Sequence, residues 1–183
     1  MDGMEMILSR TSYRGTYRQT PVPREHLKAI LEAGLDAPSG CNKQTTSLIA
    51  VDDPGLVRQL YTAIEGDGEK KHAPVGSTSP AMICVLTRRI IAYRDRTYFV
   101  QDYSAAIQNM LLAAVALGYQ SCWVEGHITD VDRLGRKMAD LLGVPPEYEL
   151  VCYLPIGIAE EATRRVRKQP FAQRAWFNGF GRD

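Results

Sequence analysis

Near the start of the chain, one short segment carries the side chains best suited to chemistry. Arg10-Thr11-Ser12-Tyr13-Arg14 places two guanidinium groups and neighbouring hydroxyls close together. Guanidinium forks and hydroxyl donors are suited to binding a phosphate or a polarised carbonyl group. The alternative is that Arg10, Ser12 and Arg14 are solvated surface residues.

A second polar segment, Ala37-Pro38-Ser39-Gly40-Cys41-Asn42, has the composition of a turn. Pro38 disfavours helical backbone at the residue before it, and Gly40 permits a positive φ. Asn42 adds an amide that both donates and accepts hydrogen bonds. An arm, a helix and a small-residue turn in this order suit an anionic, planar cofactor held at both ends. An ordinary turn at a helix end is the alternative.

The hydrophobic pattern predicts helices and strands that alternate around these segments. Strands are expected at 47–51, 81–86, 120–124 and 149–156, and a loop at 65–80. Helices are expected at 3–9, at 54–64 after an Asp53 cap, and at 102–117. Another helix is expected to begin at Pro23 and to carry one apolar stripe, formed by Leu27, Ile30, Leu31 and Leu35. The last helix is expected to begin at Thr129 and Asp132 and to end at Gly143. The helix at 102–117 is apolar almost all round, which predicts burial on all sides. Such alternation indicates an α+β or α/β sandwich.

Composition limits the possible classes of protein. The 183 residues fit a single domain over 1–183, and 22 basic against 21 acidic residues leave no net field to attract nucleic acid or a membrane. There is no signal-peptide pattern and no apolar run near the roughly 20 residues of a membrane span, so a cytoplasmic protein is expected. The three histidines lack metal-ligand spacing, so no metal site is predicted. Three cysteines in apolar runs are expected in the core, namely Cys84, Cys122 and Cys152.

Motifs along nearly the whole chain resemble the nitroreductase family of FMN-dependent oxidoreductases. The arm is similar to the family's Arg-x-Ser-x-Arg segment, and Ala37 to Gln44 is similar to its Ala-Pro-Ser-x-x-Asn-x-Gln turn. Later matches are Pro21-Val22-Pro23, the helix from Asp102, Trp123-Val124-Glu125-Gly126, Leu154-Pro155-Ile156-Gly157 and Arg165-Val166-Arg167-Lys168. No single motif is specific to the family, but the order of these motifs along the chain is specific to it.

The resemblance implies an α+β fold, a nitroreductase-like three-layer α/β/α sandwich with a central, mostly antiparallel sheet. It also implies a homodimer with FMN at the subunit interface and a C-terminal arm, residues 168–183, exchanged across the dimer. The aromatic residues of this arm would form a sticky patch if exposed, and they are Phe171, Trp176, Phe177 and Phe180. Packing of this arm on its own domain is the alternative.

The resemblance also implies the cofactor-binding residues. The residues around the FMN phosphate would be Arg10, Thr11, Ser12, Arg165 and Arg167, and Arg14 would reach the pyrimidine edge of the ring. The ring would be contacted, often from the neighbouring subunit, by Pro38, Ser39, Gly40 and Asn42. Glu125 and Gly126 would lie near flavin N5. On an extended segment, Arg165 and Arg167 point to the same side. The alternatives are a solvated or nucleic-acid-binding basic run at 164–168 and a surface carboxylate at Glu125.

The implied activity is hydride transfer from NADH or NADPH through the flavin to a nitroaromatic or quinone acceptor, with ping-pong kinetics and no catalytic side chain. A reductive dehalogenase or flavin-fragmenting enzyme of the same fold, or a flavin-binding protein without turnover, are the alternatives. The chain departs from the family after Asn42, where Lys43-Gln44-Thr45-Thr46 replaces Gln-Pro-Trp and removes an aromatic wall. Four aromatic residues are candidates to line the opening: Tyr93, Tyr98, Phe99 and Tyr103.

Overall fold

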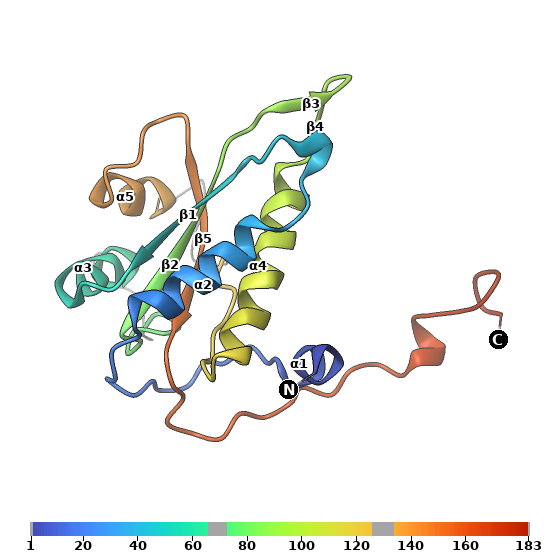
Figure 1. The fold of residues 1–183 in the computed structure, drawn as a ribbon, viewed down its shortest axis with the longest axis horizontal. Coiled ribbons are helices and arrows are strands. Elements are labelled where there is room, and N and C mark those ends of the chain that lie inside the picture. The colour runs from blue at the N-terminus through green and yellow to red at the C-terminus, as the bar shows by residue number, and fades with distance from the viewer. Residues whose placement is uncertain (1, 66–72, 126–133, 183) are drawn as a thin grey trace.

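Three antiparallel strands form the central sheet of the molecule (Figure 1). The computed structural model describes residues 2–65, 73–125 and 134–182. The strands β1 (Thr46–Val51), β2 (Ala81–Thr87) and β5 (Glu149–Ile156) lie in the order β1-β2-β5. Cys84 pairs with Ile49 on one side and with Tyr153 on the other, which fixes the register.

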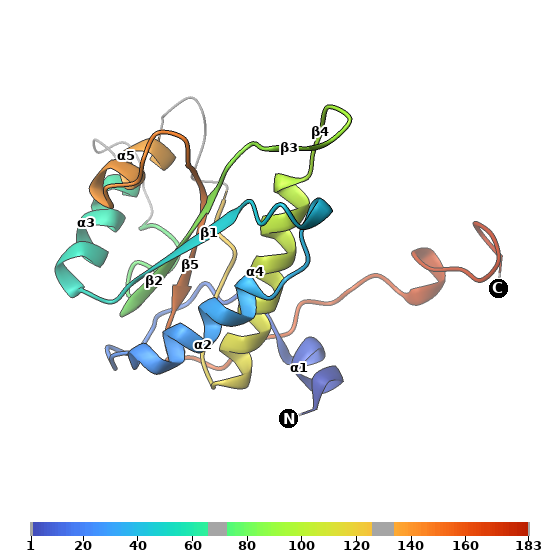
Figure 2. The ribbon, with the colours of Figure 1, turned by 45° about the horizontal axis from the view of Figure 1, so that its top comes forward.

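The middle strand β2 is buried along its whole length and feeds two separate cores. Because strand side chains alternate, Ala81, Ile83 and Val85 enter one core, and Met82 and Cys84 enter the other. Figure 2 shows a helical layer on each face of the sheet. The helices are α2 (Arg24–Leu35) and α4 (Phe99–Ala116) on the first face, and α3 (Pro54–Glu65) and α5 (Leu134–Leu141) on the second. The predicted three-layer α+β sandwich is confirmed.

Local signals explain where the helices begin and end. The Asp53 side chain accepts a hydrogen bond from the Leu56 N–H at 2.7 Å, so it caps α3 as predicted. Helix α2 begins directly after Pro23. Its apolar stripe was predicted to include Leu35, and that is wrong, because the Leu35 side chain is 60% exposed at the end of the helix.

The continuous strand predicted at 120–124 is also wrong. These residues form isolated bridges only. Gln120 pairs with Gly157 and Val124 pairs with Tyr153, both antiparallel to the same segment, β5 and the residue that follows it, and Ser121 pairs with Ser12 of the N-terminal arm. Because no two consecutive residues of 120–124 pair with β5, no continuous ladder forms. A short hairpin of β3 (Ile91–Tyr93) and β4 (Arg96–Thr97) was not predicted.

Some predictions concern residues outside the described ranges. They are residues 66–72 of the predicted 65–80 loop, Gly126, and the helix start at Thr129 and Asp132. Residues 73–80 contain turns and no helix or strand, as expected for a loop. Cys84, Cys122 and Cys152 are buried, as predicted.

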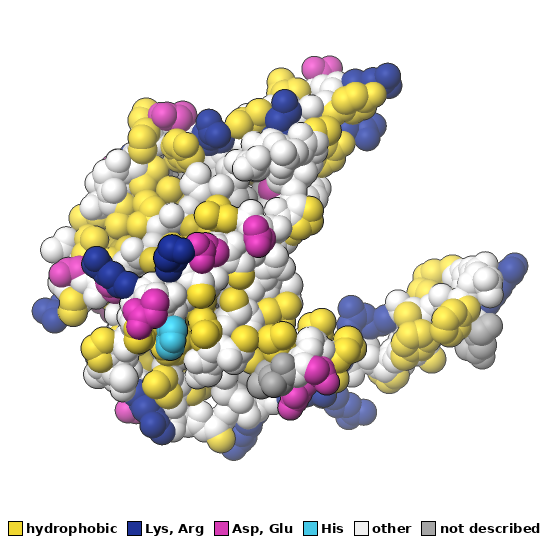
Figure 3. All heavy atoms as spheres, viewed as in Figure 1, with side chains coloured by type: hydrophobic (Ala, Val, Ile, Leu, Met, Phe, Trp, Pro, Cys, Tyr) yellow, Lys and Arg dark blue, Asp and Glu magenta, His cyan; other side chains and the backbone are white. Residues whose placement is uncertain are grey.

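Three segments leave apolar surface uncovered. Helix α4 was predicted to be buried on all sides, but its Gln108 and Ala116 are exposed in the single chain. The first helix, α1 (Gly3–Ser9), has no buried residue. Beyond Arg164, whose carbonyl accepts from Thr11, the tail runs away from the body, with apolar side chains along it (Figure 3), and Phe171 and Phe180 are 64% and 88% exposed. The alternative that this tail packs on its own domain is therefore not what the structure shows.

Within the described residues, no helix combines the length and the apolar character required to cross a membrane.

Candidate functional site

The N-terminal arm, residues 10–14, is fixed to the body by backbone pairing. Ser12 forms a parallel bridge with Ser121, and the Tyr13 N–H donates to the Ser121 carbonyl at 3.0 Å. The Thr11 hydroxyl donates to the carbonyl of Arg164 at 3.1 Å. The arm thus lies between the segment that follows α4 and the basic segment that follows β5.

A carboxylate reinforces this junction. The Tyr13 hydroxyl hydrogen-bonds the Glu161 carboxylate, and the Thr16 N–H donates to Glu161 Oε2 at 3.1 Å. A Cβ on Gly15 would overlap this carboxylate, so the close approach requires glycine. The hydrogen bond from Tyr13 holds the pKa of Glu161 below its ordinary value, and burial raises the pKa of Tyr13.

Arg10, Ser12 and Arg14 all affect the pKa of the buried Cys122 thiol. Burial raises this pKa, while the charge of Arg14, a hydrogen bond from Ser12 and the charge of Arg10 act in the opposite direction. The Ser121 Oγ, also buried, has no hydrogen-bond partner within the described residues.

An open cavity of about 480 Å³ lies where the arm meets the basic segment. Its walls are residues 11–15 and 161–164, so Thr11, Ser12 and Arg14 all line it. Arg165 and Arg167 follow directly, on an exposed stretch without helix or strand. We call this hollow the arm cavity. The structure thus brings the arm to the start of the basic segment, and hydroxyl and guanidinium donors there are suited to a phosphate. No three potential metal ligands gather anywhere in the described ranges.

The turn at residues 38–42 has a strained backbone. Cys41, Asn42 and Gln44 all have positive φ, at 50°, 52° and 47°, a conformation that costs roughly 1–2 kcal/mol per non-glycine residue. Within the turn, the Ser39 Oγ accepts from the Gln44 N–H at 3.0 Å. From outside, Asp102 accepts from the Gly40 N–H at 2.8 Å.

The arm and the turn lie at opposite ends of α4 (Figure 1). Asp102, which holds the turn, is in the first turn of this helix. Ser121, which pairs with the arm, comes shortly after its C-cap Leu117. The 18 residues of α4 span roughly 27 Å, at about 1.5 Å per residue. Within one chain, the arm and the turn are therefore separated by the length of this helix.

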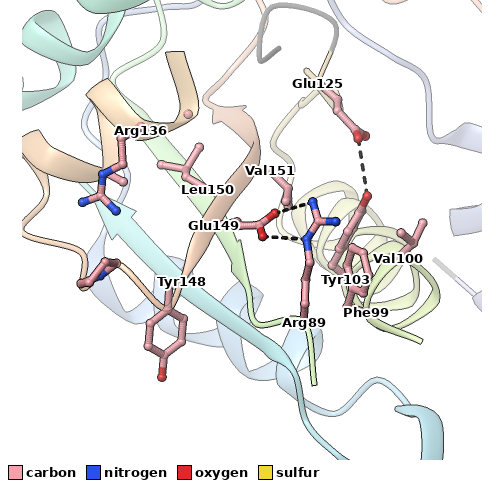
Figure 4. Close-up of a pocket in the computed structure, with 13 residues that line it drawn as sticks. Arg89, Phe99, Val100, Tyr103, Glu125, Arg136, Tyr148, Glu149, Leu150 and Val151 are labelled. Carbon is pink, nitrogen blue, oxygen red and sulfur yellow. Dashed lines mark hydrogen bonds and ion pairs between the residues drawn. The ribbon is translucent and has the colours of Figure 1, made fainter. Parts of the chain in front are cut away.

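A larger cavity of about 670 Å³ contains Glu125 (Figure 4). The Glu125 carboxylate accepts from the Trp123 Nε1 at 3.0 Å and from the Tyr103 hydroxyl at 3.5 Å. Burial, and then the charge of Glu125, raises the pKa of Tyr103. Arg89 forms a two-point ion pair with Glu149 at 2.6 and 2.9 Å across the cavity, which we call the sheet-end cavity.

The four aromatic residues that were predicted to line the opening of the site lie in three different places. Phe99 and Tyr103 line the sheet-end cavity. The Tyr98 ring packs against Gly40, where a Cβ would overlap it. Tyr93 is exposed on the hairpin, with the Arg94 guanidinium 5.0 Å from the centre of its ring.

Sequence reasoning missed two residues that shape the site. Glu161 fixes the arm, and Asp102 fixes the turn. Asp102 carried a detectable signal, because it is an acidic residue at the start of an otherwise apolar helix. Glu161 carried none, since its partner Tyr13 is far away in the sequence.

The fold and these cationic side chains define a three-layer α+β protein whose N-terminal arm and C-terminal basic segment share one site. A comparison with models of protein families matches residues 7–158 to the nitroreductase family. The chain belongs to this family, as the sequence motifs predicted.

Individual relatives agree with this assignment. A protein of Archaeoglobus fulgidus, whose name gives the activities NADH dehydrogenase and NAD(P)H nitroreductase, is 28% identical over 86% of each chain. An FMN-dependent nitroreductase from Clostridium difficile R20291 superposes with a TM-score of 0.78 at 25% identity, over 97% of this chain and 99% of that one. A Bacteroides fragilis nitroreductase with bound FMN gives 0.73 at 26% identity, over 93% and 96%.

The Tyr13–Glu161 contact predicts an acid-sensitive arm. Because the folded-state pKa of Glu161 is lowered, its contribution to stability is present above the ordinary carboxyl pKa and is lost as pH falls through the lowered value. In urea titrations, Glu161→Gln should be less stable than the wild type at pH 7, and the difference should vanish in strong acid. Glu160→Gln, at the exposed neighbouring residue, is the control and should match the wild type throughout. An unchanged Glu161→Gln protein at pH 7 would contradict this role.

Proposed function

We propose that the protein is an FMN-dependent oxidoreductase that takes hydride from NADH or NADPH and reduces an electron-poor acceptor such as a nitroaromatic or quinone. The observation that carries the proposal is the junction of arm and basic segment, where Thr11 donates to the Arg164 carbonyl and Ser12 and Arg14 line the arm cavity. The names of the relatives support the cofactor and the reductant. When bound, the flavin supplies the hydride chemistry.

The residues around the arm cavity supply the charge and the donors that this cofactor needs. Arg10, Thr11 and Ser12, with Arg165 and Arg167 from the basic segment, would hold the phosphate. Arg14 would face the pyrimidine edge, where a guanidinium stabilises the negative charge of the reduced ring. The unpartnered Ser121 hydroxyl beside Ser12 is a further buried group that a bound anion would satisfy.

A second copy of the chain would complete the site. The turn at residues 38–42 and the arm lie at opposite ends of α4, and α4, α1 and the tail leave apolar surface exposed. A two-fold axis that sets α4 antiparallel to its copy would bring the turn of each chain to the arm of the other. Residues 168–183 would then cover the partner, and residues 1–183 would act as one domain of a homodimer.

The sheet-end cavity is the proposed place for the reactants. Glu125, Phe99 and Tyr103 line it, and the aromatic rings give part of its wall apolar character. The Arg89 guanidinium lies over the Phe99 ring and pairs with Glu149, so the wall is polar without a large excess charge. Neighbouring side chains orient the reactants there, and no side chain is assigned a proton transfer.

Flavin binding tests the proposal directly. Purified protein should be yellow, or should become yellow after FMN is added and free FMN is removed. NADH or NADPH should bleach the flavin absorbance under anaerobic conditions, and a nitroaromatic or quinone should restore it. Protein that does not retain FMN would contradict the cofactor, and bound FMN that neither nucleotide bleaches would support a binding protein without turnover.

Arg14→Ala should weaken FMN binding and lower the reduction potential of the bound flavin. The loss of one charge-assisted contact corresponds to about 1.5–3 kcal/mol. Arg18→Ala is the matched control, because Arg18 is an exposed arginine a few residues along the same segment. Titration of apoprotein with FMN and spectroelectrochemistry measure both effects. If affinity and potential match those of Arg18→Ala, the assignment of Arg14 is wrong.

Deletion of residues 170–183 should convert the dimer into a monomer that does not retain FMN. Phe171, Phe177 and Phe180 are exposed in the single chain, and their burial against a partner is the expected stabilisation. Light scattering gives the mass, and the visible spectrum gives the flavin content. A yellow dimer after truncation would rule out the exchanged tail.

A further inference from the structure

We propose that Asp102 is a positioning residue whose buried carboxylate sets the backbone of the turn at residues 38–42 and, through it, the contact of this turn with the flavin held by the other subunit. This inference rests on the proposed function, because it assigns a task to a residue that itself touches no flavin. Its test is chosen to separate the two.

Asp102 is buried and both of its carboxylate oxygens are used. The side chain is 4% exposed in the first turn of α4. Oδ1 accepts from the Gly40 N–H at 2.8 Å, and Oδ2 accepts from the Thr45 hydroxyl at 2.7 Å. Thr45 is 1% exposed. One carboxylate therefore ties together the two ends of the strained stretch, at Gly40 and at Thr45.

Thr45 connects this anchor to the sheet. Its carbonyl accepts from the Arg88 N–H at 3.1 Å, directly beyond the end of β2. Asp102 belongs to α4, which packs on the same sheet. Contacts to two rigid elements, the sheet and α4, thus hold the turn in place, and a displacement of the carboxylate would move the turn relative to both.

The turn has no room to settle elsewhere without cost. A Cβ on Gly40 would overlap the Tyr98 ring, so the turn is wedged against the beginning of α4. Cys41, Asn42 and Gln44 hold positive φ. Residues in such backbone conformations persist only when surrounding contacts over-determine them, and strain of this kind concentrates at ligand contacts.

The anchored turn presents unused polar groups. Across the parts of the chain that the structure describes, the Asn42 amide nitrogen makes no hydrogen bond, although its Oδ1 accepts from Gln44 Nε2 at 3.3 Å. The hollow beside the turn, about 190 Å³ in volume, is lined by Pro38, Ser39 and Asp102. The exposed Asn42 amide is available to a group from outside the chain, and the flavin of the partner subunit is the group proposed here.

Two substitutions at Asp102 distinguish a side chain that has lost its hydrogen bonds to the turn from one that keeps them. Asp102→Ala removes both acceptors and releases Gly40 and Thr45. Asp102→Asn keeps an oxygen for the Gly40 N–H, and its amide can donate to the Thr45 hydroxyl, because a hydroxyl also accepts. Ile107→Ala is the matched control, since Ile107 is fully buried on the same helix and its side chain belongs to the apolar core.

The first measurements are FMN affinity of the apoprotein and amide hydrogen exchange at Gly40. Asp102→Ala should weaken FMN binding about tenfold or more and accelerate exchange at Gly40, with helix content and mass unchanged. Asp102→Asn should stay within about threefold of the wild type, and Ile107→Ala should lose stability while keeping its FMN affinity. If Asp102→Ala accumulates unfolded, Thr45→Val replaces it and should accelerate Gly40 exchange and weaken FMN binding in the same direction.

Equal loss of FMN affinity in Asp102→Ala and Ile107→Ala would overturn the inference, because general destabilisation would then explain both. Wild-type affinity in Asp102→Ala would overturn it as well. Neither result would affect the proposed function, which fails instead if the wild type binds no FMN.

A mixing experiment tests the action on the other subunit. In dimers of Asp102→Ala with Arg14→Ala chains, one of the two sites combines an intact arm with an intact turn. After random subunit exchange, roughly a quarter of all sites should regain wild-type FMN affinity. No recovery in verified mixed dimers would place the arm and the turn of one chain in the same site and overturn the inference.

Discussion

The site depends on a contact between the two ends of the chain. Thr11 donates to Arg164 across a separation of 153 residues, and Glu161 accepts from Tyr13 and Thr16 close by. Closing so long a loop costs entropy, but most of that cost is already met, because β5 and the Tyr17–Ala159 bridge bring the segments together. Without this contact the arginines of the arm and of the basic segment would belong to two separate solvated strands of chain.

The packing of α4 on the sheet determines which of the candidate site residues lie close together in a single chain. Packing of α4 across the sheet sends its first turn toward Gly40 and its last turn toward the arm. The rigid helix holds the two groups apart within one chain. The uncovered face of α4 and the exposed tail are the surfaces that the proposed second copy would cover.

Much of the fold was predictable from the sequence because burial leaves a periodic pattern. β2 is apolar from Ala81 to Leu86 and is buried at every position, and the start of α3 follows from the Asp53 cap. The failures share a cause. The pattern at 120–124 is that of a buried strand, but the segment pairs with β5 only near its two ends and with Ser12 in between, and pattern alone does not reveal partners. Likewise, an apolar helix indicates burial without indicating whether its own chain or a second one supplies the cover.

The candidate site was less predictable because its geometry depends on tertiary contacts. The arm motif indicated phosphate-type chemistry, yet nothing in the sequence showed that Glu161 would hold the arm. Strain adds a further layer, since left-handed backbone at Cys41 and Gln44 is not what these residue types predict. Arg94 and Asp95 also have positive φ, as a two-residue hairpin turn requires, and β3 of this hairpin contacts the turn. The backbone of the turn is therefore set by the tertiary contacts of Asp102 and Tyr98, which the local sequence does not show.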